Sequence, residues 1–364
     1  MTGSPPNQDS CRKNYFALFW NGLNSFGAEP DSAHSFSRTG TVNASRLACC
    51  AALAWLLVLP SLATSAQPSH ITLPPQAPAI VDKIYSLDFP GAVEAAKRMQ
   101  HESPDHPLGY LLEAEALWWR IWCTSADFKY GMNDARRRPK LAGDQHYLEL
   151  AARALSLAEA QIKQGESAEM QFYAGMAEAS AARLYGLRAE NRYAARAGVR
   201  GREHLLRAKV LDPDLADADL GLGLYNYYVD TLSAVARILR FFMGIPGGSK
   251  QEGVRLLEHA IEHGSLTSNV ARFYLALNLH RYDQQYEKAL AVLTPLVEKY
   301  PENPLFQLVR GDLYAKLGRK QQALASYRAA STLLLQDAEC QAHVRELTRI
   351  SIVALGMKND GGDR

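Results

Sequence analysis

Cysteine is scarce in this sequence, which excludes a disulfide-rich class of protein. Five cysteines occur among 364 residues, and Cys11, Cys49 and Cys50 fall within the first 50. The remaining two, Cys123 and Cys340, lie far apart in the chain. Disulfide frameworks and structural zinc sites both need several cysteines at close spacing. We therefore expect two lone thiols, with neither a disulfide framework nor a structural zinc site.

An excess of charge of one sign is also lacking. The chain has 40 Lys and Arg against 38 Asp and Glu, a net charge of +2. Its one dense basic run, residues 136–138, is interpreted as a solvated loop. Nucleic acids and anionic membranes attract proteins through surplus cations. The balance therefore predicts no nucleic-acid partner, and it does not require a membrane.

Long apolar runs are rare, and the main one lies near the start of the chain. Arg46 precedes an apolar core at 47–59, which ends at Pro60 and the small residues 64–66. A basic residue, a short apolar core and small residues in this order are typical of a secretory signal peptide. The core is short for a membrane-spanning helix. We predict a signal peptide over 42–66, cleaved after Ala66, and a periplasmic or outer-membrane-associated protein; a retained anchor is the alternative.

The segments around this signal have no helical period. Residues 1–41 are polar and rich in Ser, Gly and Asn, so we expect a disordered leader. Our hypothesis is that translation starts at Val42, which detection of any peptide from 1–41 in the native organism would refute. Residues 67–78 are Pro-rich and predict a linker, and residues 358–364 predict a disordered tail.

Two segments late in the chain repeat each other at a spacing of 34 residues. Ala289 is followed by Leu293 and Leu296, and Ala323 is followed by Tyr327 and Ala330. A small residue where two helices cross, with large apolar residues one turn away, describes a helix pair that must stack on a copy of itself. This period and pattern resemble the tetratricopeptide repeat (TPR) family, which implies an interaction protein rather than an enzyme.

The same small residue recurs upstream. The leading small residues are Ala92, Ala151, Gly201, Gly253, Ala289 and Ala323, with steps of 59, 50, 52, 36 and 34 residues. No stretch alternates as a strand does. We therefore predict an all-α protein, a right-handed α-solenoid of about six TPR-like helix pairs over 79–335. A further amphipathic helix at 336–357 is expected to cap it.

The most unusual segment surrounds a predicted insert at 227–250. Gly221 and Gly223 are expected to let another helix approach closely, and 232–243 is spaced as an apolar helix. A Gly-rich helix, an apolar inserted helix and a Gly turn together resemble the eukaryotic inclusion-body clearance proteins and their TPR relatives, which again implies interaction. The insert either packs as extra core or lines the groove beside a ligand; docking of the 229–243 helix to a membrane or lipid is a further alternative.

In TPR arrays the first helix of each pair lines a concave groove, so the resemblance implies a groove that binds a partner peptide or helix. Asn278 and Arg281 would grip a backbone amide or a carboxylate; the alternative is a packing amide and a solvated cation. The predicted groove residues are Phe172, Met176, Tyr225, Asn226, Tyr228, Tyr274, Asn278, Arg281 and Asp312.

Two motifs resemble a phosphate-binding loop and a zinc site, but the residues around each motif argue against these functions. Residues 244–250 lack the Gly-Lys-Ser/Thr order and the preceding strand of a phosphate-binding loop, so a turn with Ser249 as a helix cap suffices. His259, Glu262 and His263 match the H-x-x-E-H pattern of a zinc-dependent hydrolase, but Gly264 ends that helix at once. We predict a non-enzymatic, exported scaffold for another protein or peptide, with no cofactor; the zinc-dependent hydrolase is kept as the alternative.

Overall fold

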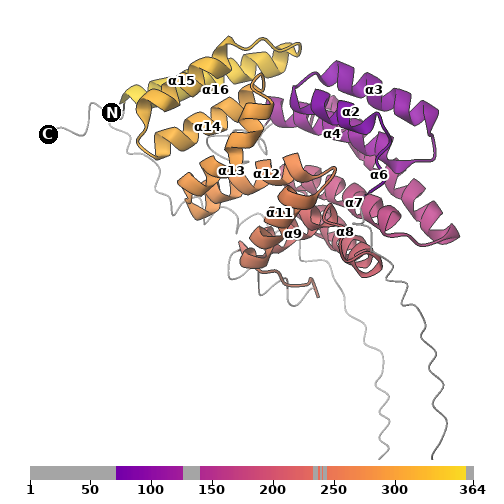
Figure 1. Ribbon diagram of the computed structural model, residues 1–364. Helices are drawn as coiled ribbons and strands as arrows, with labels where there is room; N and C mark the ends of the chain where they lie inside the picture. The colour runs from indigo at the N-terminus through magenta and orange to yellow at the C-terminus, as the bar shows by residue number, and fades with distance from the viewer. Residues whose placement is uncertain (1–70, 126–139, 233–236, 238–239, 241–243, 358–364) are drawn as a thin grey trace, which may run out of the picture. The chain divides into compact units, whose positions relative to one another are not determined.

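The computed structural model describes residues 71–125, 140–232, 237, 240 and 244–357 of the chain. Within these ranges the protein consists of α-helices and one π-helix, η1, without a strand (Figure 1). The α-helices are α2 (Ala77–Tyr85), α3 (Phe89–Glu102), α4 (Pro107–Ser125), α6 (Ala142–Gln164), α7 (Ala168–Leu187), α8 (Asn191–Leu211), α9 (Ala218–Asp230), α11 (Lys250–His263), α12 (Ser268–Asn278), α13 (Tyr286–Lys299), α14 (Pro304–Lys316), α15 (Lys320–Thr332) and α16 (Ala338–Met357).

Several predicted segments fall outside the described residues. They are the leader and signal peptide at 1–66, the basic run 136–138, most of the apolar stretch 232–243 and the tail 358–364. Predictions about these segments remain predictions.

Consecutive helices pack as pairs. The pairs are α2/α3, α4/α6, α7/α8, α9/α11, α12/α13 and α14/α15, and α16 packs against the last of them. Each of the six small residues that predicted the pairs is buried on the second helix of its pair. Since such a pair cannot bury its apolar face alone, successive pairs stack. The prediction of an all-α solenoid of about six helix pairs is confirmed.

Glycines allow the two helices of a pair to touch backbone to backbone. A Cβ atom on Gly201 would lie 3.1 Å from the carbonyl oxygen of Gly175 on α7. A Cβ on Gly253 would lie 2.8 Å from the carbonyl oxygen of Gly223 on α9. Gly221, on the other side of α9, faces Leu205 of α8. The close approach predicted at Gly221 and Gly223 is therefore present: Gly221 faces the preceding helix, α8, and Gly223 faces the following helix, α11.

Side-chain caps fix where several helices begin. The Ser249 hydroxyl accepts a hydrogen bond from the Glu252 N–H at 3.3 Å, as the sequence predicted for the start of α11. The Asp88 carboxylate accepts from the Gly91 N–H at 3.0 Å, and the Asn303 side-chain oxygen accepts from the Leu305 N–H at 2.9 Å. Each cap satisfies an N–H group that the first turn of a helix leaves unpaired.

The array closes on itself. The Tyr300 hydroxyl donates to Asp82 at 2.6 Å, and the Asn303 amide donates to the backbone oxygen of Tyr85 at 2.8 Å. The Trp119 ring lies 4.9 Å from Phe273 and 5.8 Å from Phe306, measured between centroids. Helices α2 and α4 therefore pack against α12, α13 and α14, whereas the repeats of an open solenoid contact only their neighbours.

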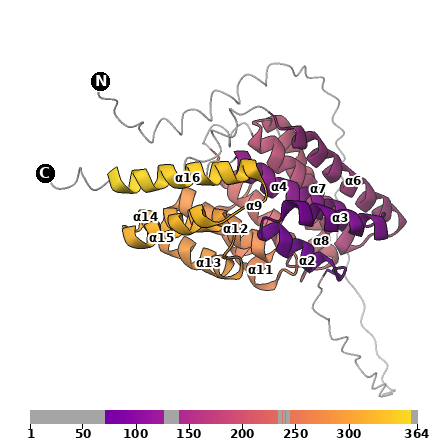
Figure 2. The same ribbon diagram turned by 90° about the horizontal axis from the view of Figure 1, so that it is seen from above.

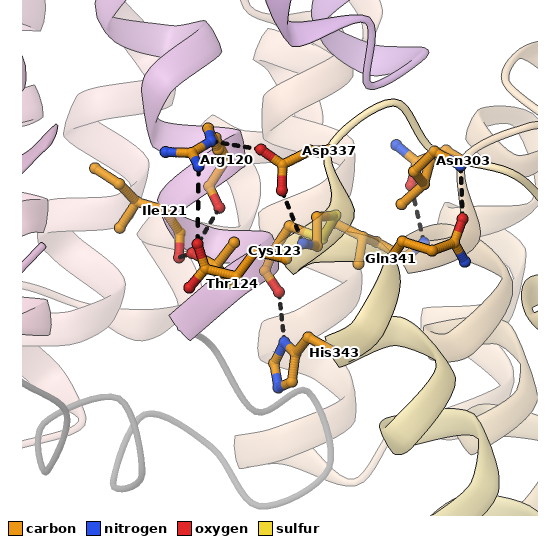
Figure 3. Close-up of a disulfide and its surroundings, with 12 residues drawn as sticks. Arg120, Ile121, Cys123, Thr124, Asn303, Asp337, Gln341 and His343 are labelled. Atoms are coloured by element: carbon orange, nitrogen blue, oxygen red, sulfur yellow. Dashed lines mark hydrogen bonds and ion pairs between the residues drawn. A yellow bond between two sulfur atoms is a disulfide. The ribbon is translucent and has the colours of Figure 1, made fainter.

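Closure overturns one expectation from the sequence. Cys123 and Cys340 form a disulfide with their Cα atoms 5.3 Å apart, so the expectation of two lone thiols was wrong (Figure 3). They are 217 residues apart in sequence, but the end of α4 lies next to the start of α16, and Figure 2 shows one end of α16 beside α4. The separation of Cys123 and Cys340 in the sequence argued against a disulfide only because an open array was assumed, in which distant repeats do not meet.

Candidate partner-binding site

Two predicted groove residues meet at the C-terminal ends of α9 and α12. The Tyr228 hydroxyl donates a hydrogen bond to the side-chain oxygen of Asn278 at 3.1 Å. The Tyr228 and Tyr282 rings lie 6.3 Å apart, nearly edge to face, and remain 37% and 48% exposed. The two rings form an exposed aromatic pair, a composition that is enriched at protein interfaces. Tyr228, Tyr282 and Asn278, together with Arg281, are called the tyrosine site below.

A π-helix shapes this site. η1 spans Leu279–Asp283 directly after α12, and Gln284 follows with a left-handed φ of 54°. Its end is fixed because the Tyr227 hydroxyl donates to Asp283 at 3.0 Å and Lys250 forms an ion pair with the same carboxylate. Burial raises the pKa of Tyr227, so its hydroxyl stays a hydrogen-bond donor. Short π-helical turns are common at functional sites.

Asn278 has unused hydrogen-bonding capacity. Its side chain is 1% exposed, and its amide nitrogen has no hydrogen-bond partner among the described residues. A buried amide N–H₂ without a partner costs free energy, so such groups are rare in folded proteins. Asn278 is therefore not explained by packing alone.

Arg281 joins the tyrosine site to α4. Its guanidinium carbon lies 6.0 Å from the centre of the Trp122 ring, within the range of a cation–π contact. Trp122 is itself buried at the end of α4. The cation is thus held over an aromatic ring rather than extended into solvent.

Tyr225 and Asn226 lie away from this group. The Tyr225 hydroxyl donates to the backbone oxygen of Pro246 at 3.0 Å, and the Asn226 side-chain oxygen accepts from the Ser249 N–H at 3.3 Å. Both side chains secure the turn that leads into α11.

The other predicted groove residues serve packing or separate hydrogen bonds. Phe172 is fully buried against Tyr173, and Met176 packs half-buried at the edge of the core. Asp312 accepts a hydrogen bond from the Tyr327 hydroxyl at 2.6 Å, within the last helix pair. These three do not join the tyrosine site.

Tyr274 is half-buried beside a half-buried ion pair. Arg183 of α7 pairs with Glu115 of α4 and lies 4.5 Å from the Trp118 ring centre. Burial raises the pKa of Tyr274, and the Arg183 charge partly offsets that rise. Tyr274 is therefore engaged with α4 and α7 and does not join the tyrosine site.

The zinc motif is engaged in other contacts. The His259 ring nitrogen Nδ1 lies 2.6 Å from the buried carboxylate of Asp219, and His263 lies beside Glu262 at 3.7 Å. Across the described residues, no cluster of three or more His, Cys, Asp or Glu side chains is arranged to hold a metal ion.

A pocket of about 590 Å³ opens between α11 and the start of α13. Its charged side chains pair with one another: Lys250 with Asp283, Arg255 with Glu252 and Lys288 with Glu258. The charges that line this pocket are therefore balanced among themselves.

The membrane alternative depends largely on residues outside the described ranges. The 229–243 helix is described only up to Leu232 and at Arg237 and Arg240. Among the described helices, none combines the length and the apolar character needed to cross a bilayer.

Sequence reasoning missed Tyr282 and Trp122 as parts of the site. Tyr282 stands in a π-helix, which a period of 3.6 residues does not predict, and Trp122 reaches Arg281 only because α4 packs inside the closed array. No pattern in the sequence signals either contact.

Comparison with known proteins adds little. No protein-family model matches the chain, and no curated protein matches it. One similar solved structure is that of YrrB, described as a TPR protein with an unusual peptide-binding site. It is 14% identical, with a TM-score of 0.30, and the match covers 70% of this chain and 99% of that one. The fold assignment above therefore rests on the helix packing of this chain.

Proposed function

We propose that this protein is an exported helical-repeat scaffold that binds a segment of another protein at the tyrosine site. The observation that carries the proposal is the pairing of two exposed tyrosine rings with a buried, underused amide at Asn278. Aromatic side chains dominate the energetics of protein interfaces, because they bury much area at little cost in rotamer entropy.

Each group has a role in this scheme. The Tyr228 and Tyr282 rings supply apolar contact area for a side chain of the partner. An amide side chain presents a donor and an acceptor together, which matches the hydrogen-bonding groups of a peptide backbone. Rotation of the Tyr228 hydroxyl away from Asn278 would open this amide to the partner. Arg281, held over Trp122, would attract a carboxylate.

Two features support export. The first is the signal-like pattern over 42–66. The second is the disulfide between Cys123 and Cys340, since disulfides persist in oxidising compartments and are rare in the cytosol.

Site-directed photo-crosslinking tests the binding proposal. A photoreactive phenylalanine analogue at position 282 should form a discrete adduct with the partner in native cells. The same analogue at Tyr193, an exposed tyrosine on α8 that is 56% accessible, serves as the matched control. Tyr228→Ala in the position-282 background should abolish the adduct. Equal adducts from both positions, or an adduct indifferent to Tyr228→Ala, would show that the tyrosine site does not bind the partner.

A further inference from the structure

The disulfide lies one residue from a side chain that contacts the tyrosine site. Cys123 directly follows Trp122, and the Trp122 ring lies 6.0 Å from the guanidinium carbon of Arg281. Arg281 in turn follows Asn278 by three residues, within η1. The covalent link between α4 and α16 is therefore connected through two side chains to the proposed partner site.

Apart from the disulfide, polar contacts join α4 to α16 and to the residue before it, among them ion pairs of Arg120 with Asp337 and Glu339. Arg120 pairs with Asp337 at 2.6 Å, and the His343 ring bonds the backbone oxygen of Cys123 (Figure 3). The Arg120 side chain is 41% exposed, and ion pairs exposed to this extent contribute little stability. Helix α16 also packs against α15 and α14. The S–S bond is thus the covalent link in a contact that these polar groups also hold.

We propose that Cys123–Cys340 is a redox-controlled clasp that regulates the tyrosine site. In the reducing step, one thiolate of a dithiol attacks a sulfur of the disulfide and forms a mixed disulfide, releasing the other cysteine. The second thiol of the reagent then closes its own disulfide, and Cys123 and Cys340 end as thiols after the transfer of two electrons and two protons. The end of α4 then separates from the first turn of α16, Trp122 loses its fixed position, and Arg281 moves with it.

Access to the sulfurs requires local opening. Both cysteines are fully buried, but each lies within three residues of a helix end, where helices open most readily. Asp337 holds the start of α16 closed, because its carboxylate accepts from the Cys340 N–H at 2.8 Å while it pairs with Arg120. Weakening Asp337 should therefore speed reduction without touching either cysteine.

Hydrogen–deuterium exchange on the full chain tests the clasp, with oxidised protein, dithiol-reduced protein and Cys340→Ser compared. Exchange should rise by about tenfold more in peptides from 115–125, 279–283 and 338–345 than in peptides from α7 and α8 in the two open forms. Circular dichroism should show the same helix content in all forms. Unchanged exchange at these peptides would overturn the proposal. A loss of helix throughout the chain would also overturn it, because the disulfide would then stabilise the whole fold rather than control one site.

The rate of reduction gives a second test. Asp337→Asn should accelerate reduction by dithiothreitol by about fivefold, the size expected when a partly exposed ion pair is lost. Glu346→Gln is the matched control, because Glu346 also pairs with an arginine on α16 but lies away from the disulfide. Equal rates in the wild type and both variants would contradict a clasp that opens at the first turn of α16.

The regulatory part of this inference rests on the proposed function, but both measurements use the chain alone. If reduction opens the clasp but crosslinking at position 282 fails, the redox-controlled opening stands and the proposed partner site does not. If crosslinking succeeds but reduction does not open the clasp, the partner site stands and is not regulated by the disulfide.

Discussion

Gly253 shows how strongly this fold depends on single atoms at its helix crossings. A Cβ at this position would lie 2.7 Å from the Tyr227 backbone nitrogen and 2.8 Å from the Gly223 carbonyl oxygen. Both are backbone atoms, so the two helices must move apart to admit a methyl group. We expect Gly253→Ala to lower the free energy of unfolding by about 2 kcal/mol, measured by urea denaturation.

Gly198 on α8 provides the matched control. A Cβ there meets nothing within 4 Å, and the position is helical. Gly198→Ala should raise the free energy of unfolding by about 0.5–1 kcal/mol through helix propensity alone. If both substitutions stabilise the protein, the close crossing of α9 and α11 is wrong.

His280 gives the protein a pH dependence. Burial lowers its pKa from 6.5 to about 4, with further lowering from the Arg281 and Lys316 charges. The unfolded chain therefore binds a proton between about pH 6.5 and about pH 4 that the folded chain does not. Stability should be complete above pH 6.5 and should fall by about 3 kcal/mol as pH drops towards 4.

Urea denaturation at several pH values checks this. His280→Gln should flatten the slope between pH 6.5 and 4, whereas His101→Gln on the exposed face of α3 should retain the wild-type slope. An unchanged slope in His280→Gln would contradict a buried neutral imidazole.

At the scale of elements, α12 is positioned by one carboxylate from the segment before α9. Asp217 accepts hydrogen bonds from the Leu266 and Thr267 N–H groups at 2.8 Å each, and from the Thr267 hydroxyl at 2.8 Å. It is 2% exposed, so its loss leaves buried donors unpaired. Asp217→Ala should cost about 3 kcal/mol and should raise hydrogen exchange in α12 more than in α6. Equal exchange changes in α12 and α6 would argue against this role.

The elements themselves were largely predictable from the sequence. Small residues such as Ala289 and Ala323 mark helix crossings because a larger side chain would hold the helices apart, and that constraint is local. The π-helix was not predictable, because its extra residue depends on the contacts of Asp283 with Tyr227 and Lys250, which come from other helices. Tyr228 and Asn278 were predicted from their helix positions to line one groove, and their side chains are hydrogen-bonded in the structure; Tyr282 was not predicted beside them.

At the scale of the whole molecule, closure makes the array differ from an open solenoid. Open arrays unfold partly from their ends, because each repeat contacts only its neighbours. Here the hydrogen bond from Asn303 to the Tyr85 backbone oxygen joins the last pair to the first, and the disulfide joins α4 of the second pair to α16. The oxidised protein should therefore unfold in one transition seen equally by circular dichroism and fluorescence.

Loss of the disulfide should be costly. The bond closes a loop across 217 positions, and chain-entropy reasoning gives about 5 kcal/mol for a loop of this length. Cys340→Ser should lower the free energy of unfolding by up to about that amount. A Ser351→Ala control on the same helix removes a buried hydroxyl without affecting the crosslink and should cost less. Equal losses in the two variants would mean that the crosslink adds nothing.

Closure is also the feature that sequence reasoning could not reach. Repeat periodicity reports how each pair contacts the next, but the curvature of the array accumulates small rotations that no single residue encodes. Cys123 and Cys340 therefore looked unrelated, and Trp119 gave no sign that it meets Phe306.

The most direct test of this account is mass spectrometry of the protein isolated from its native cells, digested with trypsin without reduction. The account predicts a linked pair of peptides, residues 121–129 joined to 329–345, in a chain that begins at Gln67. A chain that retains its signal sequence and has Cys123 and Cys340 both as free thiols would contradict it.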